Sequence, residues 1–180
     1  MSSADCVVRP MRVSDLPFVS MTIRHDAHGG HYHSLYATDD RHLTNLIVSI
    51  GRGLEGATVI LGGGQPHSLI GLTLECAEKP SGFAVFTTIE PDRPLTELWL
   101  MSIDPGQRYK GLGKRLLDGA LAMPQIEKSP LLVRCNPPSA AMMSLLRHRG
   151  FQMLGTGPEG THFIGRKIPQ SVRMAFQRPH

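Results

Sequence analysis

The sequence lacks most features of secreted, membrane-spanning or metal-binding proteins. It has 3 cysteines among 180 residues, and no two of them form a Cys-x-x-Cys pair, which argues against a disulfide scaffold and a cysteine zinc site. No apolar run approaches the roughly 20 residues that a transmembrane helix needs. The amino-terminal segment has no long apolar core like that of a signal peptide. We therefore expect a cytoplasmic protein with reduced cysteines and no membrane association.

A strong excess of one charge is also missing. Lys and Arg number 19 against 15 Asp and Glu, so the formal net charge is only +4. Apart from the stretch 108–115 and the pair Arg147 and Arg149, the basic residues are scattered, which does not indicate nucleic-acid binding. A length of 180 residues favours one domain. We expect this domain to cover residues 1–168 and a polar carboxy-terminal tail to cover 169–180.

The sequence does contain a strand that leads into a basic loop with glycines. Residues 96–103 are rich in aliphatic, aromatic and β-branched side chains, and residues 104–107 have the composition of a turn. Residues 108–115 then open a helix, whose first amides have no partner within the helix. Gly111 and Gly113 let a ligand approach the backbone closely. Four basic residues flank the loop: Arg108, Lys110, Lys114 and Arg115. This order predicts a site for a pyrophosphate or polyphosphate group.

The pattern Arg108-x-x-Gly111-x-Gly113 after such a strand resembles the acyl-CoA loop of the GNAT superfamily of N-acetyltransferases. It is not a Walker loop, because no Gly-Lys-Ser/Thr follows the required spacing, and only two of the three Rossmann glycines can be placed. The resemblance implies that loop amides hold the pyrophosphate of coenzyme A. The residues it implicates are Arg108, Tyr109, Lys110, Gly111, Leu112, Gly113 and Lys114. The alternative is a strand-to-helix turn that binds nothing.

The rest of the chain reads as alternating short strands and amphipathic helices. Apolar stretches predict strands near 7–10, 58–61, 69–76, 96–103, 131–135 and 161–167, and a further strand that begins at Phe151; the second and third form a hairpin. Helical spacing predicts helices near 14–24, 38–50, 112–121 and 139–149. Residues 83–86 form either an extra strand or a packed loop. The order is similar to that of the GNAT fold, which implies an α/β protein with a mixed central sheet of about six or seven strands flanked by about four helices.

The resemblance also assigns roles on the strand before the loop. A backbone amide of Met101, Ser102 or Ile103 would meet the thioester carbonyl, an interaction of a kind worth roughly 3 kcal/mol in a transition state. Glu97 stands eleven positions before Arg108 (108 − 97), the spacing of the base in the histone-acetylating branch of the family. It is our candidate general base, the alternative being a Glu that pairs with another residue or faces solvent. Strand alternation puts Glu97, Trp99 and Met101 on one face.

A second family signature is incomplete. Members often end the fourth helix with Leu-Tyr-x-Lys-x-Gly-Phe, where the Tyr protonates the leaving thiolate, but this chain has Leu146 at that position. The Asn that often opens the segment aligns with Ser139, and Asn136 lies three residues earlier; we expect both to contact the cofactor. The missing Tyr is the reason to keep a non-catalytic acyl-CoA-binding or regulatory module as the alternative function.

A loop rich in histidine lies between the first two predicted helices. It contains His25, His28, His31 and His33, with Asp26 nearby. A His-x-His pair could chelate a metal, but no second ligand cluster stands out, so we expect no metal. In GNAT proteins this connection borders the acceptor site, which implies that Tyr32, His33 and Tyr36 contact the acceptor.

The sequence therefore predicts an N-acetyltransferase that moves an acetyl group from acetyl-CoA to an amine by direct attack. The acceptor is an unidentified small-molecule or protein amine, and the resemblance adds a homodimer as an expectation. A nucleotide-binding protein that uses the same loop is a third interpretation.

Overall fold

The computed structural model describes residues 6–61, 64–89 and 95–176. The first half contains β1 (Cys6–Pro10), α1 (Leu16–His28), α2 (Leu35–Thr38), α3 (Asp40–Leu54), β2 (Val59–Ile60), β3 (Pro66–Cys76) and β4 (Lys79–Ile89). The second half contains β5 (Leu95–Ile103), α4 (Leu112–Leu121), α5 (Pro124–Glu127), β6 (Leu131–Cys135), α6 (Ala140–Arg147), β7 (Gln152–Thr156), β8 (His162–Arg166) and α7 (Gln170–Phe176). Three short 3₁₀ turns, η2 (Val13–Asp15), η3 (Pro105–Gln107) and η4 (Pro158–Gly160), connect some of these elements.

These strands form one mixed sheet, as expected. Its order is β1-β3-β4-β5-β6-β8-β7, with β2 paired to β3. In the described residues the sheet has 8 strands, slightly more than the sequence predicted. The pairing is antiparallel except between β5 and β6, which are parallel. The predicted hairpin of the second and third strands is confirmed by the pairing of β2 with β3.

The extra strand is β4, which the sequence left open as a strand or a loop. β3 and β4 are joined by a turn at Ala77 and Glu78, both of which have positive φ. A turn with two such residues is typical of a tight β-hairpin, but it usually carries Asn, Asp or Gly. Because neither residue is a usual turn former, the hairpin was not recognisable from its turn. Phe83 and Phe86 on β4 are completely or almost completely buried.

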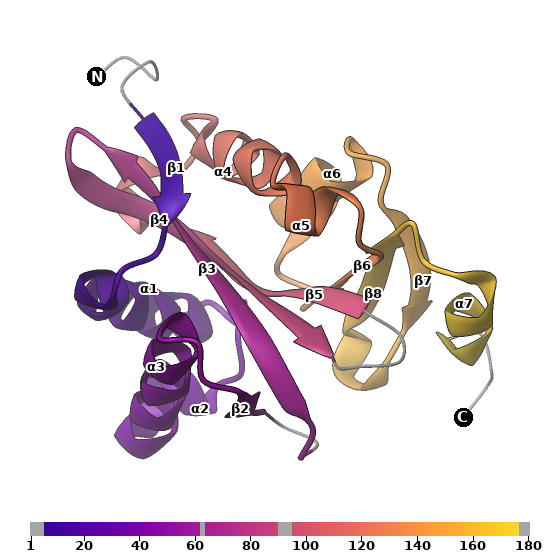
Figure 1. The fold of residues 1–180 in the computed structure, drawn as a ribbon, viewed down its shortest axis with the longest axis horizontal. Coiled ribbons are helices and arrows are strands. Elements are labelled where there is room, and N and C mark those ends of the chain that lie inside the picture. The colour runs from indigo at the N-terminus through magenta and orange to yellow at the C-terminus, as the bar shows by residue number, and fades with distance from the viewer. Residues whose placement is uncertain (1–5, 62–63, 90–94, 177–180) are drawn as a thin grey trace.

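Helices cover the sheet on both faces (Figure 1), and each face has its own core. One core joins Leu112, Leu116 and Leu117 of α4 to sheet residues such as Leu74 and Leu98. The other core contains Val19 and Ile23 of α1, Leu43 and Ile50 of α3, and Leu100 of β5. We call these the α4 face and the α1–α3 face. The apolar residues whose spacing predicted these helices are therefore the ones that pack against the sheet.

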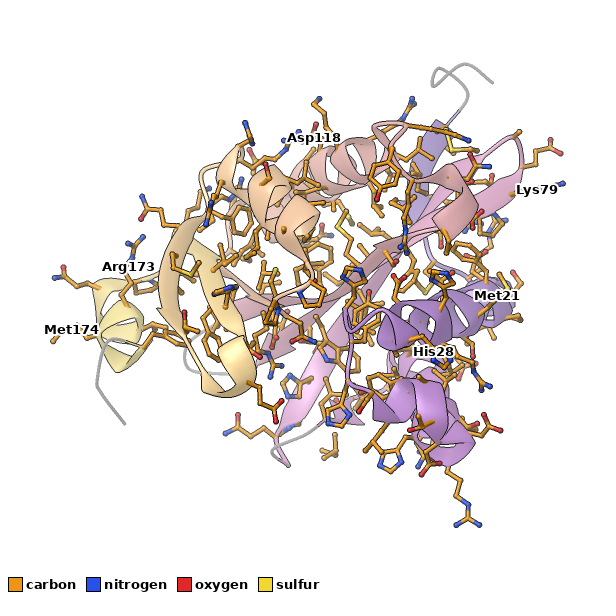
Figure 2. All side chains as sticks on the ribbon, turned by 180° about the vertical axis from the view of Figure 1, so that it is seen from behind. Met21, His28, Lys79, Asp118, Arg173 and Met174 are labelled. Atoms are coloured by element: carbon orange, nitrogen blue, oxygen red, sulfur yellow. A yellow bond between two sulfur atoms is a disulfide. The ribbon has the colours of Figure 1, made fainter. Side chains whose placement is uncertain are left out.

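The segment expected to be a polar tail includes helix α7. Val172 and Phe176 are four positions apart, so they share one helical face. They pack against a small core made by Leu132, Leu154 and Ile168. Figure 2 shows Met174 of α7 at one end of the molecule and Met21 of α1 at the other. The apolar spacing within 170–176 explains why this part of the tail is folded.

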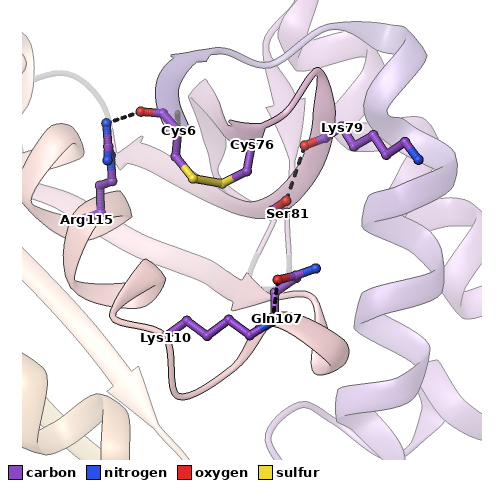
Figure 3. The surroundings of a disulfide bond; sticks show 7 residues. All are labelled: Cys6, Cys76, Lys79, Ser81, Gln107, Lys110 and Arg115. Carbon is purple, nitrogen blue, oxygen red and sulfur yellow. Dashed lines mark hydrogen bonds between the residues drawn. A yellow bond between two sulfur atoms is a disulfide. The ribbon is translucent and has the colours of Figure 1, made fainter. Parts of the chain in front are cut away.

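The expectation that all cysteines are reduced is wrong for two of them. β1 pairs antiparallel with β3 and places Cys6 opposite Cys76, with 4.1 Å between the Cα atoms. The two residues form a disulfide, and Cys135 stays a free, buried thiol. Figure 3 shows this disulfide beside Arg115 of α4, which donates a hydrogen bond to the carbonyl of Cys6. The pairing spans 70 positions, and no local spacing in the sequence indicates it.

Candidate active site

A cleft opens where β5 and β6 separate. The two parallel strands pair at only three positions, Thr96 with Leu131, Glu97 with Leu132, and Leu98 with Val133. Beyond Leu98 and Val133 the strands diverge, and a cleft of about 560 Å³ lies between them. A parallel sheet that splits in this way leaves backbone amides and carbonyls without strand partners, and a ligand can use them.

A β-bulge in β5 lies at the point where the strands separate. In the register between β4 and β5, Val85 pairs with Leu100 while Phe86 pairs with Leu98, so Trp99 is the additional residue. Trp99 and Leu100 both pack on the α1–α3 face, because a bulge interrupts the alternation of side chains. Met101 packs on the α4 face. The expectation that Trp99 and Met101 share a face is therefore wrong.

The loop that contains Gly111 and Gly113, here called the glycine loop, borders the cleft at the end of β5. Asp104 accepts a hydrogen bond from the amide of Gly106, 3.2 Å away, which fixes the turn. Gly111 precedes α4 with φ of 76°, and no side chain caps this helix. The first amides of α4 are therefore not satisfied by a capping side chain, and glycine suits the positive φ. Lys110 lies on the far side of the loop, in a groove next to Cys6 and Val8.

Most residues predicted for the site line the cleft. They are Tyr32, Met101, Ser102, Ile103, Arg108, Tyr109, Gly111, Leu112, Gly113, Lys114 and Ser139. Four other predicted residues lie outside its lining: Glu97, Asn136, His33 and Tyr36. The rings of His33 and Tyr36 contact each other, with centroids 6.3 Å apart.

A buried carboxylate holds the first residue of the loop motif. Asp26 of α1 is only 4% exposed; it forms an ion pair with Arg108 and accepts a hydrogen bond from the hydroxyl of Ser102. The Nε of Arg108 also donates to the carbonyl of Ile103, 3.1 Å away. Arg108 therefore ties the loop to β5 and α1, and breaking this pair would leave a buried charge unpaired.

The predicted histidine loop is shorter than expected, because His25 and His28 belong to α1; the segment after α1 forms part of the cleft wall. The Nδ1 of His31 is 3.2 Å from the hydroxyl of Ser139, and the hydroxyl of Tyr32 donates to the carbonyl of Met101 over 2.8 Å. Burial raises the pKa of Tyr32, and the charge of Asp26 raises it further. Tyr32 therefore stays protonated at neutral pH. The amide of Asn136 donates to the carbonyls of Gly30 and His31, each 3.3 Å away, so Asn136 fixes this loop.

Glu97 is buried next to the cleft and is paired with Arg134. The Nε of Arg134 donates to Oε1 of Glu97 over 2.6 Å. The side chain of Glu97 is 7% exposed, whereas that of Arg134 is 51% exposed and lines the cleft. Of the two alternatives to a general base, a Glu that pairs with another residue or one that faces solvent, the structure shows the paired Glu. Because Glu97 is outside the cleft lining, we expect a proton transfer to Glu97 to need a bridging water.

Several lining residues were not predicted from the sequence. The main ones are Asp26, His31, Arg134, Pro138, Met142 and Leu145. A signal for Asp26 existed, because it follows Val19, Thr22 and Ile23 at helical spacing on the buried face of α1. Arg134 is a single charged residue within an apolar strand, and that pattern also indicates a residue with a specific partner.

The described residues contain no group of three or more His, Cys, Asp or Glu side chains that could hold a metal ion. None of the helices in the described ranges is long and apolar enough to cross a membrane.

Comparison with known proteins connects this geometry to one family. The model of the acetyltransferase (GNAT) family matches residues 53–151, which include β5, the glycine loop, α4 and α6. Comparison with curated proteins finds no match.

Solved structures of acetyltransferases share the fold. The PaiA N-acetyltransferase of Thermoplasma acidophilum, in complex with coenzyme A, is 17% identical with a TM-score of 0.69, over 93% of this chain and 100% of that one. A phosphinothricin acetyltransferase of Sinorhizobium meliloti, in complex with acetyl-CoA, is 18% identical with a TM-score of 0.65, over 90% and 88%. A ribosomal-protein-alanine N-acetyltransferase of Brucella melitensis is 18% identical with a TM-score of 0.61, over 90% and 99%.

Proposed function

The chain belongs to the GNAT acetyltransferase family, and on this basis we propose that it transfers the acetyl group of acetyl-CoA to an amine. The observation that carries the proposal is the glycine loop at the mouth of the cleft. Gly111 and Gly113 lie between the end of β5 and the uncapped start of α4. Similar structures contain coenzyme A or acetyl-CoA.

The residues present fit the phosphate end of such a cofactor. A Cβ added at Gly111 would meet no atom within 4 Å, so the backbone at this position is open to a ligand. Lys114 lines the cleft near the first amides of α4. Amides at a helix start favour an anion, and a cation beside them adds to the attraction. When bound, the cofactor supplies the activated acetyl group.

The strand before the loop would position the acetyl group. Met101, Ser102 and Ile103 lie on the cleft side of β5, beyond its last pair with β6. A strand amide there has no β6 partner and is free to donate to a thioester carbonyl. Tyr32 binds the carbonyl of Met101 and thereby holds the backbone of this strand in place.

Glu97 remains our candidate for the general base. Its carboxylate is next to the cleft and would receive the proton of the acceptor through a water, because Glu97 is outside the cleft lining. The position of the usual acid, a tyrosine in many members, is taken by Leu146. This side chain is completely buried in the α4-face core. In the absence of that Tyr, the thiolate leaves unassisted or takes a proton from another group.

The decisive experiment separates catalysis from binding. Calorimetry with acetyl-CoA and with ATP tests which ligand the loop takes, and release of free thiol in the presence of an amine panel tests turnover. Binding of acetyl-CoA with amine-dependent thiol release supports the proposed enzyme. Binding without release for every amine would favour the non-catalytic acyl-CoA-binding module, for which the missing Tyr is the specific observation. Binding of ATP without binding of acetyl-CoA would favour a nucleotide-binding protein.

The cytoplasmic location and the homodimer stay predictions. The disulfide between Cys6 and Cys76 speaks against a reducing compartment, because disulfides are rare there. Cell fractionation with detection of the protein in each fraction tests the first prediction, and sedimentation tests the second.

A further inference from the structure

Arg134 occupies a defined position in the cleft. It directly follows Val133, the last β6 residue that pairs with β5. The corresponding residue on β5 is Trp99, the bulged residue after Leu98. Both side chains line the cleft. Arg134 therefore lies at the vertex, the point where the two strands begin to separate.

The side chain of Arg134 points to the α1–α3 face. Its neighbours Val133 and Cys135 belong to the α4-face core, and successive side chains on a strand alternate. Arg134 also reaches Glu97, which alternates with Leu98 in the same way. Burial raises the pKa of Tyr36, and the positive charge of Arg134 lowers it. The glycine loop and α4 lie on the other side of the vertex.

The hydrogen bond of Arg134 leaves its two terminal nitrogens, Nη1 and Nη2, available for a ligand. Glu97 takes only the Nε–H, at 2.6 Å, and among the described residues no partner is found for Nη1 or Nη2. The other two long cations of the cleft have other places: Arg108 pairs with the buried Asp26, and Lys114 lies beside the first amides of α4. Terminal guanidinium nitrogens bind carboxylates in a bidentate manner. Glu97 holds the guanidinium in place, which lowers the cost of ordering it on binding.

We propose that Arg134 binds a carboxylate of the acceptor, so that the acceptor is an amine that also carries a carboxylate, such as a free amino acid. This inference rests on the proposed function, because it concerns the acceptor of that reaction. Tyr32 and Trp99 border the same part of the cleft and provide apolar surface for the rest of the acceptor. The carboxylate fixes the acceptor at the vertex, and its amine then faces the α4 side, where the acetyl group would lie.

The test compares amino acids with the amines that lack only the carboxylate. Suitable pairs are L-phenylalanine with phenethylamine, L-tryptophan with tryptamine, and L-leucine with isopentylamine. Each probe is titrated by calorimetry into the protein, with and without saturating coenzyme A. We expect at least one amino acid to bind tenfold or more tightly than its matched amine. Arg134→Gln should abolish this preference and leave the affinity for the amine unchanged.

Variants control for folding, since Arg134→Gln leaves the buried Glu97 without its cation. Arg134→Lys keeps a charge but loses the fork, and the double variant Glu97→Gln, Arg134→Gln removes both charges. Both should lose the preference for the carboxylate. Arg52→Gln, at an exposed position near the end of α3, should retain it.

The outcomes distinguish this inference from the proposed function. Equal affinities of all amino acids and their matched amines, absence of binding by every amino acid, or an unchanged preference in the Arg134 variants would overturn the role of Arg134. Failure of the proposed function has a separate signature, namely no binding of acetyl-CoA and no release of thiol. In that case the carboxylate titrations still decide whether Arg134 binds an anion.

Discussion

Replacement of Gly113 by Ala tests the glycine loop without disturbing the fold. Gly113 is the second residue of α4. A Cβ at this position would lie 3.8 Å from Cγ1 of Ile103 and 3.8 Å from Cδ2 of Leu145, which is ordinary van der Waals contact. Alanine also favours a helix over glycine by up to about 1 kcal/mol. The free energy of unfolding should therefore stay the same or rise slightly.

The same methyl group should weaken the binding of acetyl-CoA. A phosphate oxygen bound to a loop amide lies about 2.9 Å from the nitrogen, and a Cβ beside that amide occupies part of the approach. A hydrogen bond to a charged group contributes about 1.5–3 kcal/mol. Loss of one such bond raises the dissociation constant roughly tenfold or more, since tenfold corresponds to about 1.4 kcal/mol. Gly113→Val, with two more carbons, should lose more affinity than Gly113→Ala.

Calorimetric titration with acetyl-CoA and thermal unfolding measure the two effects separately. Gly106→Ala is the matched control, because its Cβ would meet only Oδ1 of Asp104, at 3.9 Å, and Gly106 does not line the cleft. We expect the control to bind as the unmodified protein does. An unchanged dissociation constant in folded Gly113→Ala and Gly113→Val would refute the assignment of the loop to the pyrophosphate.

Three further predictions concern catalysis, pH and redox state. Glu97→Gln should lower kcat about 10²–10⁴-fold at neutral pH, less at high pH where more acceptor arrives deprotonated; wild-type kcat across the pH range would exclude Glu97 as the base. Although burial raises the pKa of Asp15, hydrogen bonds from Arg9, the amide of Arg12 and Thr73 lower it to about 2 from 3.8. The Asp15 carboxylate therefore adds about 2 kcal/mol to the free energy of unfolding. This contribution is fully present above about pH 4 and is lost as the pH falls through about 2. Asp15→Asn should lose this part of the pH dependence in denaturant titrations, and an unchanged profile would contradict it. The disulfide closes a loop across 70 positions. Its reduction should lower the free energy of unfolding by up to about 4 kcal/mol and Tm by roughly 10 °C. An unchanged Tm in protein with three titratable thiols would contradict this prediction.

Features that depend on neighbours along the chain were predictable from the sequence. Helix α4 shows its apolar face as Leu112, Leu116, Leu117 and Ala120, and all four are buried. Asp39 directly precedes α3 and accepts hydrogen bonds from the amides of Arg41 and His42 at the start of this helix, as an Asp at a helix start typically does. The loop between β5 and α4 combines turn residues, glycines and a helix start within a dozen positions, so that local chemistry was enough to locate it.

Features that depend on strand register were not predictable in this way. The pair of Cys6 and Cys76 and the pair of Glu97 and Arg134 each join residues that are distant in sequence. Their contact requires a particular strand order, and a shift by one residue would move each side chain to the other face. The bulge at Trp99 has the same origin, since it exists only in the register between β4 and β5.

Under the proposed function, one cleft has to receive two substrates, and the bulge and the separation of β5 from β6 suit it to this task. Because the strands part after Leu98 and Val133, side chains from both faces of the sheet line the cleft. Val133 and Met101 border it from the α4 face, while Trp99 and Tyr32 pack on the α1–α3 face. A cofactor bound by the glycine loop would enter from the first face and an acceptor from the second. Under the proposed function the two meet at the vertex, so direct transfer needs no rearrangement of the sheet.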